Sequence, residues 1–108
     1  MKRYEGRREG YAVDVTVNGI PLDPRLDLYN HSPTGFEWGY GGSGPAQLAL
    51  AMLASHFGDE AKALAIYQDF KREVVAGLPK RGWTLSSRDI DQALDAIRKQ
   101  NDANGGVS

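Results

Sequence analysis

The feature that most constrains this chain is a nearly continuous apolar run from Ala46 to Phe57, in which only Gln47, Ser55 and His56 are polar. Pro45 precedes the run, and proline suits the first position of a helix because the missing N–H would have no partner there. A helix that is apolar on almost every side must be buried on most of them. We therefore expect this helix at the centre of the core.

The length of the chain, 108 residues, leaves room for one domain. A domain of this size buries roughly two-thirds of its unfolded surface, and so it needs one continuous core. We expect a single domain over residues 1–100. Residues 101–108 contain two glycines and little apolar content, and we expect them to form a flexible tail.

The first part of the chain has the composition of β-strands. Residues 11–17 alternate apolar and polar side chains, which is typical of a half-buried strand. Asn18-Gly19 favours a type I′ turn, after which residues 20–22 can return beside that strand, while residues 2–8 pair on its other side. Phe36, Trp38 and Tyr40 alternate with Glu37 and Gly39, so residues 36–40 could form a last strand.

Two amphipathic helices are predicted after the apolar one. Asp59 can cap the first, whose apolar stripe is Ala63, Ile66, Tyr67, Phe70 and Val74. We expect Gly77 to end it in a left-handed conformation, with Pro79 preventing continuation. Residues 80–83 are predicted to be a loop. Ser86 and Asp89 predict a capping box for the last helix, whose stripe is Ile90, Ala93, Leu94 and Ile97.

These elements predict an α+β fold. A small antiparallel sheet of about three to four N-terminal strands packs against three C-terminal helices, arranged around the apolar first helix.

Composition excludes several kinds of function. The chain has no cysteine, which excludes disulfides, thiolate zinc sites and cysteine nucleophiles. The net charge of -1 gives no whole-protein attraction to nucleic acid or to an anionic membrane. There is no N-terminal leader pattern and no apolar run of membrane-spanning length, so we expect a soluble, cytoplasmic protein without a membrane partner. His31 and His56 are too few ligands for a metal, and we expect no cofactor.

The glycine-rich segment from Gly41 to Gly44 leads directly into the apolar helix. Backbone N–H groups at a helix start can hold an anion, which suggests a phosphate- or nucleotide-binding protein or enzyme. The segment lacks the lysine and hydroxyl of a P-loop and the spacing of a dinucleotide fingerprint, and Pro45 removes one donor. The alternative is that the glycines allow a tight turn and a close approach of the helix to the sheet.

The segment from Asn30 to Gly44 is polar and aromatic. A triad of His31 and Ser32 with Asp27 or Glu37 has no supporting motif, and these side chains could instead bond to backbone groups in a turn. The aromatic side chains could all anchor the core, or Trp38 or Tyr40 could be a partly exposed interaction anchor. The candidate binding residues are His31, Ser32, Glu37, Trp38, Tyr40, Gly42, Ser43, Gly44 and Gln47.

Basic residues concentrate near the N-terminus and in residues 71–81. If the two segments fold together, Arg7, Arg8, Lys80 and Arg81 form a patch for phosphates, with Trp83 and Tyr4 able to stack on bases. This predicts weak nucleic-acid binding; the other interpretation is a solvated charged face.

The stretch NHSPTGFEWGYGGSGPAQLALA, residues 30–51, resembles the signature of an uncharacterised family of small proteins found in bacteria, phages and other mobile elements. The similarity extends from about Tyr4 into the last predicted helix. It implies a recurring domain associated with mobile DNA and transfers no catalytic residue. The leading hypothesis is a non-catalytic binding protein that occupies a protein partner, for example a component of a host defence system.

Overall fold

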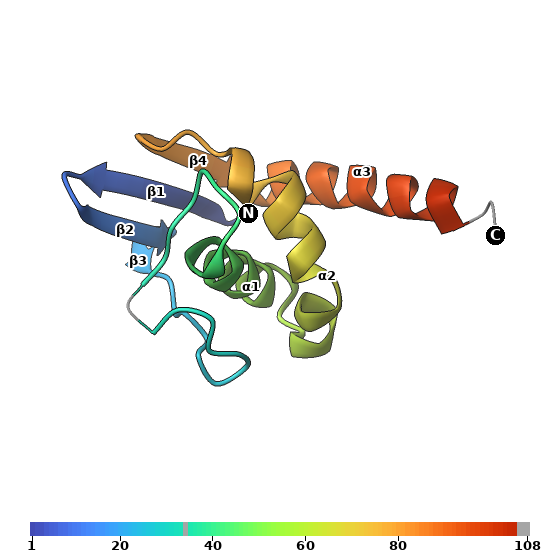
Figure 1. Ribbon diagram of the computed structural model, residues 1–108, viewed down its shortest axis with the longest axis horizontal. Coiled ribbons are helices and arrows are strands. Elements are labelled where there is room, and N and C mark those ends of the chain that lie inside the picture. The colour runs from blue at the N-terminus through green and yellow to red at the C-terminus, as the bar shows by residue number, and fades with distance from the viewer. Residues whose placement is uncertain (34, 106–108) are drawn as a thin grey trace.

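The chain folds into a four-stranded antiparallel sheet and three α-helices, as a computed structural model shows for residues 1–33 and 35–105 (Figure 1). The sheet has the strand order β3-β2-β1-β4. The elements in chain order are β1 (Arg3–Glu9), β2 (Ala12–Val17), β3 (Ile20–Pro21), α1 (Ser43–Phe57), α2 (Glu60–Glu73), the 3₁₀ helix η1 (Val75–Gly77), β4 (Gly82–Ser86) and α3 (Ser87–Gly105). The α+β class predicted from the sequence is confirmed.

Turn chemistry sets the register of the first three strands. Gly10 has a φ of 59° and joins β1 to β2, whose ends pair Glu9 with Ala12. Asn18 and Gly19 have φ angles of 51° and 81°, as the predicted type I′ turn requires. The returning strand β3 has only two residues, because Pro21 has no N–H to offer a longer ladder.

The fourth strand is not the one that the sequence suggested. Residues 36–40 are irregular: Gly39 has a φ of 86° and Trp38 is fully buried in the core. Instead β4 pairs with β1 and includes Gly82 and Trp83, which were predicted to lie in a loop. Opposite Trp83 stands Gly6, where any Cβ would clash with the indole ring. The alternating aromatic residues therefore do not form a strand, and Trp38 packs into the core instead. The fourth strand forms because Trp83 fits against Gly6, which is far away in the sequence.

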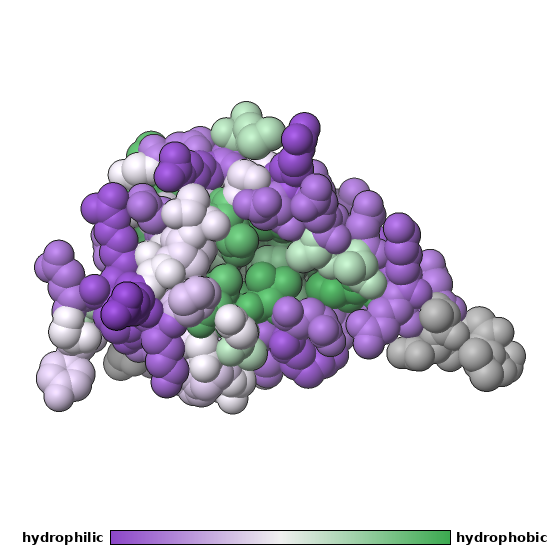
Figure 2. Space-filling view, turned by 90° about the horizontal axis from the view of Figure 1, so that it is seen from above, coloured by the Kyte–Doolittle hydropathy of each residue, from purple (hydrophilic) through white to green (hydrophobic). Residues whose placement is uncertain are grey.

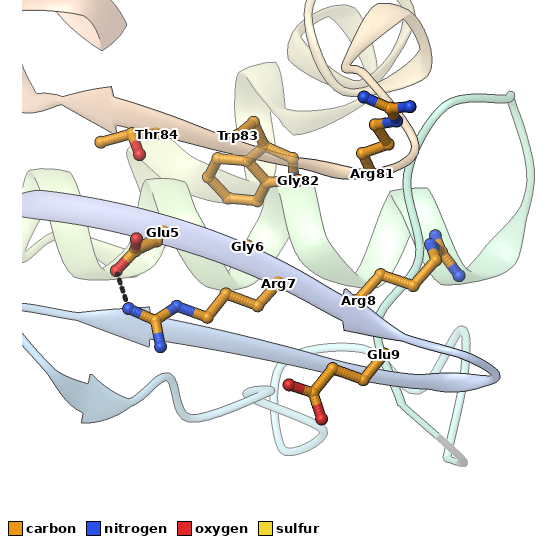
Figure 3. Close-up of a pocket in the computed structure, with 9 residues that line it drawn as sticks. All are labelled: Glu5, Gly6, Arg7, Arg8, Glu9, Arg81, Gly82, Trp83 and Thr84. Carbon is orange, nitrogen blue, oxygen red and sulfur yellow. Dashed lines mark hydrogen bonds and ion pairs between the residues drawn. The ribbon is translucent and has the colours of Figure 1, made fainter.

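Helix α1 is the buried centre of the fold, as expected. Every residue from Gly44 to Ala54 is buried, and Gly58 ends the helix with a φ of 63°. In Figure 3, α1 lies behind β1 and β4, so it covers one face of the sheet. The Tyr4 hydroxyl on β1 donates to Ser55 Oγ at 3.0 Å, which ties the sheet to the end of α1.

Helix α2 packs along α1 and shows the predicted apolar stripe. Ala63, Tyr67 and Phe70 are buried, and the Asp59 side chain caps the helix by accepting from the Lys62 N–H. The prediction for its end was wrong. The helix stops at Glu73 and η1 follows, and Gly77 is not among the glycines with positive φ.

Helix α3 begins at the predicted capping box. The Ser86 N–H donates to Asp89 at 2.9 Å, and the Asp89 N–H donates to the Ser86 hydroxyl at 3.1 Å. The helix runs on through Asn101 to Gly105, which the sequence had assigned to a flexible tail; residues 106–108 lie outside the described part of the chain.

The far end of α3 projects beyond the body of the molecule (Figure 1). Figure 2 shows apolar residues near the middle of one face, where η1, α2 and α3 come together, with hydrophilic residues around them. Partly buried Val74, Leu78, Leu85 and Ala93 pack against the buried core. None of the helices in residues 1–33 and 35–105 has the length and apolarity needed to cross a membrane.

Candidate binding surface

The candidate site is built on residues 22–42, the connecting loop between β3 and α1, which has no helix or strand in its described residues. Such a loop must satisfy its backbone groups through contacts from elsewhere. Gln47 of α1 does this for the first half of the loop. The second half is held through its side chains, by contacts centred on Trp38 and on Arg8 of β1.

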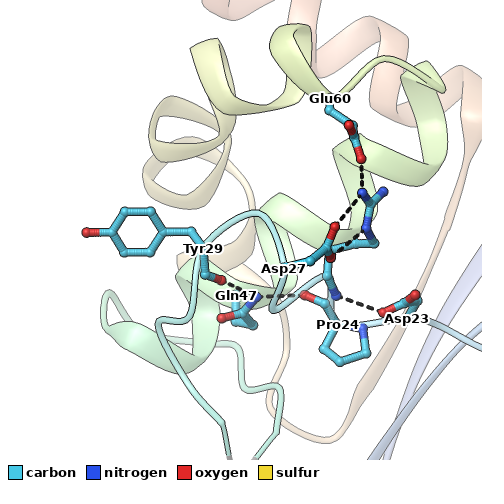
Figure 4. A network of polar contacts seen from close by, with 7 residues as sticks. Asp23, Pro24, Asp27, Tyr29, Gln47 and Glu60 are labelled. Carbon is cyan, nitrogen blue, oxygen red and sulfur yellow. Dashed lines mark hydrogen bonds and ion pairs between the residues drawn. The ribbon is translucent and has the colours of Figure 1, made fainter.

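Gln47 is fully buried and makes four hydrogen bonds to the loop backbone. Its Oε1 accepts from the N–H groups of His31 at 2.8 Å and Ser32 at 3.1 Å. Its Nε2 donates to the carbonyls of Pro24 at 2.6 Å and Tyr29 at 3.0 Å, as Figure 4 shows. Gln47 was predicted as a binding residue, but every polar atom of its side chain is occupied within the fold, and no partner can reach it.

Trp38 holds the second half of the loop against the sheet. Its indole Nε1 donates to the Pro79 carbonyl at 2.9 Å, and its ring meets Trp83 edge to face with centroids 5.6 Å apart. Arg8 lies over the Trp38 ring and binds both carboxylate oxygens of Glu37, at 2.6 and 3.1 Å. These hydrogen bonds lower the pKa of Glu37 below its ordinary value of 4.5. Trp38 is a core anchor, and Glu37 is bound within the fold.

The glycine-rich segment is explained by close packing. A Cβ on Gly42 would lie 2.6 Å from the Tyr40 ring, and a Cβ on Gly44 would lie 2.7 Å from Glu37 Cβ. Gly44 is buried, whereas Gly41 and Ser43 are exposed. Among residues 1–33 and 35–105, no side chain caps the start of α1, where Gly42 is extended. The close-approach interpretation accounts for Gly42 and Gly44, and the helix start stays uncapped.

Five of the candidate residues meet around one hollow of about 310 Å³, which we call the tyrosine hollow. Its walls carry two exposed tyrosines, Tyr11 in the turn that precedes β2 and Tyr40 on the connecting loop. The lining residues are Tyr11, Val13, Ser32, Gly35, Phe36, Glu37, Tyr40, Ser43 and Gly44. Sequence reasoning missed Tyr11 because it was counted among the apolar residues of the predicted strand over residues 11–17. The structure places it in the turn after Gly10, where its side chain is fully exposed.

His31 lies apart from this hollow. Its Nε2 shares a hydrogen bond of 2.7 Å with the Tyr67 hydroxyl, and Tyr29 stacks on its ring with centroids 4.2 Å apart. Burial, and then the charge of Lys71, lower the pKa of His31 below its ordinary value of 6.5. The neighbouring Ser32 hydroxyl donates to the Gly35 carbonyl at 2.7 Å, a bond within the turn, whereas the His31 side chain bonds to Tyr67 of α2. The two side chains therefore do not face each other as nucleophile and base.

The two basic segments do fold together. Arg7 stands opposite Gly82 in the sheet, and a shallow hollow of about 460 Å³ is lined by Arg7, Arg8 and Arg81 together with Glu5 and Glu9 (Figure 3). Lys80 lines a second hollow of about 290 Å³ with Tyr40. Base stacking by Trp83 and Tyr4 is wrong, because both side chains are buried.

No three His, Cys, Asp or Glu side chains of residues 1–33 and 35–105 come together as a metal site.

Comparison with known proteins identifies a family. The family model described as Family of unknown function (DUF6166) matches residues 4–96, so the chain belongs to this family. No curated protein and no solved structure matches the chain.

Proposed function

We propose that this member of DUF6166 is a non-catalytic binding protein that occupies a protein partner through the tyrosine hollow. The observation that carries the proposal is the division of aromatic side chains on the connecting loop. Trp38 is fully buried and anchors the loop, while Tyr40 is 46% exposed and lines the hollow together with the fully exposed Tyr11. Tyrosines held on an ordered scaffold lose little conformational entropy on binding and are frequent interface hot spots.

Catalysis has less support from the same residues. The Ser32 hydroxyl and the His31 imidazole are hydrogen-bonded to different partners, Gly35 and Tyr67. Glu37 is held by Arg8. Nucleophilic catalysis needs a nucleophile and a base within hydrogen-bond reach of each other, and these side chains do not provide the pair.

The mode of action follows because the tyrosine hollow would bind a partner without catalysing a reaction on it. The protein acts stoichiometrically, by covering a surface that its partner needs. A phage or mobile element, as the sequence resemblance suggested, would use such a protein against host machinery, including a defence component.

The test is to capture proteins from a lysate of the native host, with and without the two tyrosines of the hollow. Immobilised wild type is compared with a Tyr11→Ala/Tyr40→Ala variant, and bound proteins are quantified by mass spectrometry. We expect one protein near equimolar amount on the wild type and at least about ten-fold less on the variant, since hot-spot truncations cost about 2 kcal/mol or more. Tyr29→Ala is the matched control, because Tyr29 is exposed but lies outside the hollow. Equal capture by the double variant would contradict the proposal.

A second candidate function rests on the uncapped start of α1. With no side-chain cap and no acidic residue in the first turn, the N–H groups of Ser43 and Gly44 could bind a phosphate at the hollow. Titration calorimetry with ATP, GTP and pyrophosphate tests it. Heat that saturates in the millimolar range or below would support a nucleotide-binding protein, and flat traces would exclude it.

A further inference from the structure

We infer that the protein partner presents acidic side chains beside the tyrosine hollow, where Lys80 and Arg81 receive them. This inference rests on the proposed function and names the chemistry of the same partner. We call Lys80 and Arg81 the basic corner. It belongs to the turn that precedes β4. Lys80 lines a hollow with Tyr40, and Arg81 lines the neighbouring hollow; Arg8 borders both.

Contacts from the rest of the fold fix the position of Lys80. Its carbonyl accepts from Arg8 Nε at 2.7 Å and from Trp38 Nε1 at 3.2 Å. Its aliphatic stem lies against Gly39, where an added Cβ would be 2.8 Å from Lys80 Cγ. The hollow that Lys80 lines shares Tyr40 and Glu37 with the tyrosine hollow. A partner seated on Tyr40 therefore meets a lysine whose backbone and stem are already ordered, which lowers the entropic cost of binding.

The basic corner carries positive charge that no neighbouring carboxylate neutralises within the described residues. Arg8 is neutralised by Glu37, and Arg7 contacts Glu5 at 3.3 Å with Glu9 in the same hollow. In the part of the chain that the structure describes, no carboxylate forms an ion pair with the side chain of Lys80 or Arg81. Glu37 is close enough for the charge of Lys80 to lower its pKa, but its two oxygens are already bound by Arg8.

The number of spare cations favours an acidic protein segment over a nucleic acid. The affinity of a nucleic acid grows with the number of phosphates that a protein neutralises. Here two cations remain, and the Trp83 side chain that would stack on a base is buried, with 7% of its surface exposed. Two cations at the edge of an aromatic hollow match one or two carboxylates, in the arrangement of a polar rim around a hot spot.

The test uses a displayed library of random dodecapeptides as the probe. Peptides are selected on the wild type and counter-selected on the Tyr11→Ala/Tyr40→Ala variant, so that only hollow-dependent sequences remain. We expect an excess of Asp and Glu in them. For the best peptide, Lys80→Glu/Arg81→Glu should lower the association rate about ten-fold at low salt and less at high salt, because rim charges act mainly on association. Arg98→Glu/Lys99→Glu on α3 changes the net charge equally and should leave the rate within about two-fold.

The outcomes separate this inference from the proposed function. Hollow-dependent peptides without an acidic excess, or with an association rate insensitive to Lys80→Glu/Arg81→Glu, would overturn the basic corner and leave the hollow as a binding site. Absence of any hollow-dependent peptide would count against the hollow and the corner together. A labelled dT20 oligonucleotide is measured in parallel. If it binds the wild type and Lys80→Glu/Arg81→Glu abolishes that binding, the corner is assigned to nucleic acid instead.

Discussion

The connecting loop differs from the strands and helices of this molecule in the contacts that hold it in place. Strands and helices satisfy their backbone groups with near neighbours, as the β1–β2 register and the capping box of α3 show. The connecting loop instead depends on a few side chains that reach it from other elements, chiefly Gln47 from α1 and Arg8 from β1. Many weak local contacts therefore stabilise one region and a few long-range contacts stabilise the other. Single substitutions should affect the two regions very differently.

The largest effect is expected at Gln47. Gln47→Leu replaces the buried amide with an apolar side chain of similar size. It leaves the His31 and Ser32 N–H groups and the Pro24 and Tyr29 carbonyls without their partner. Buried polar groups without a partner cost about 1–3 kcal/mol each, so we expect a loss of about 3 kcal/mol or more in the free energy of unfolding. Urea denaturation measures it.

The matched control for this prediction is Gln92→Leu on the exposed face of α3, which should change stability by less than about 0.5 kcal/mol. If Gln47→Leu lost less than about 1 kcal/mol, the smallest penalty for one buried group, the loop would not depend on this residue.

A smaller effect is expected at Gly6, where the regular part of the molecule also relies on one tight fit. Gly6→Ala places a methyl group against the Trp83 indole, and overpacking of this kind costs about 1–3 kcal/mol. Denaturant unfolding monitored by tryptophan fluorescence would show both the loss and a change around Trp83. Gly41→Ala is the control, because a Cβ there meets open space and the position has no positive φ. Equal stabilities of the two variants would show that β1 and β4 can move apart to accommodate the methyl group at no cost.

The helix cap should matter less still. Ser86→Ala removes one side of the capping box of α3 and should cost about 1 kcal/mol, seen as a lower Tm. Ser43→Ala, at the uncapped start of α1, is the comparison and should have almost no effect. A loss at Ser86 as large as at Gln47 would remove the distinction between local and long-range stabilisation.

The smallest effect is a pH dependence from the Arg8–Glu37 pair. Because the pKa of Glu37 is lowered in the folded protein, its contribution to stability is present above the ordinary value of 4.5 and is lost as the pH falls through the lowered pKa. Wild type should therefore have a higher Tm than Glu37→Gln at pH 7, and the difference in Tm should shrink as the pH is lowered below 4.5 and through the lowered pKa. Glu73→Gln controls for the removal of one exposed carboxylate. A gap that persists unchanged at low pH would contradict this assignment.

Local sequence patterns predicted the local structure well. The turn at Asn18-Gly19, the caps at Asp59 and Ser86 and the burial of the apolar helix each follow from a few adjacent residues. Strand β4 was missed because its pairing depends on the space that Gly6 leaves for Trp83, far away in the sequence. The end of α2 was misplaced because the helix tightens into η1 before the glycine and proline are reached.

The candidate site was predicted in part for the same reason. The sequence pointed to the right segment, and Ser32, Glu37, Tyr40, Ser43 and Gly44 do meet around one hollow. The sequence could not show that the side chains of Gln47 and Trp38 are buried. A single Gln in an apolar helix does not indicate which backbone groups it will bind. Nor could the sequence bring Tyr11 to the hollow, which required the hairpin and the loop to be placed in space.

The two rims of the sheet determine how this protein behaves among copies of itself. At one rim, Pro21 has no hydrogen to donate, and the Leu22 N–H is already taken by Val15. At the other, the Gly82 N–H is used by Pro79, and the Ser86 N–H by Asp89. A strand from another molecule would find few donors to extend the ladder, and edge-to-edge growth into fibres is thereby discouraged.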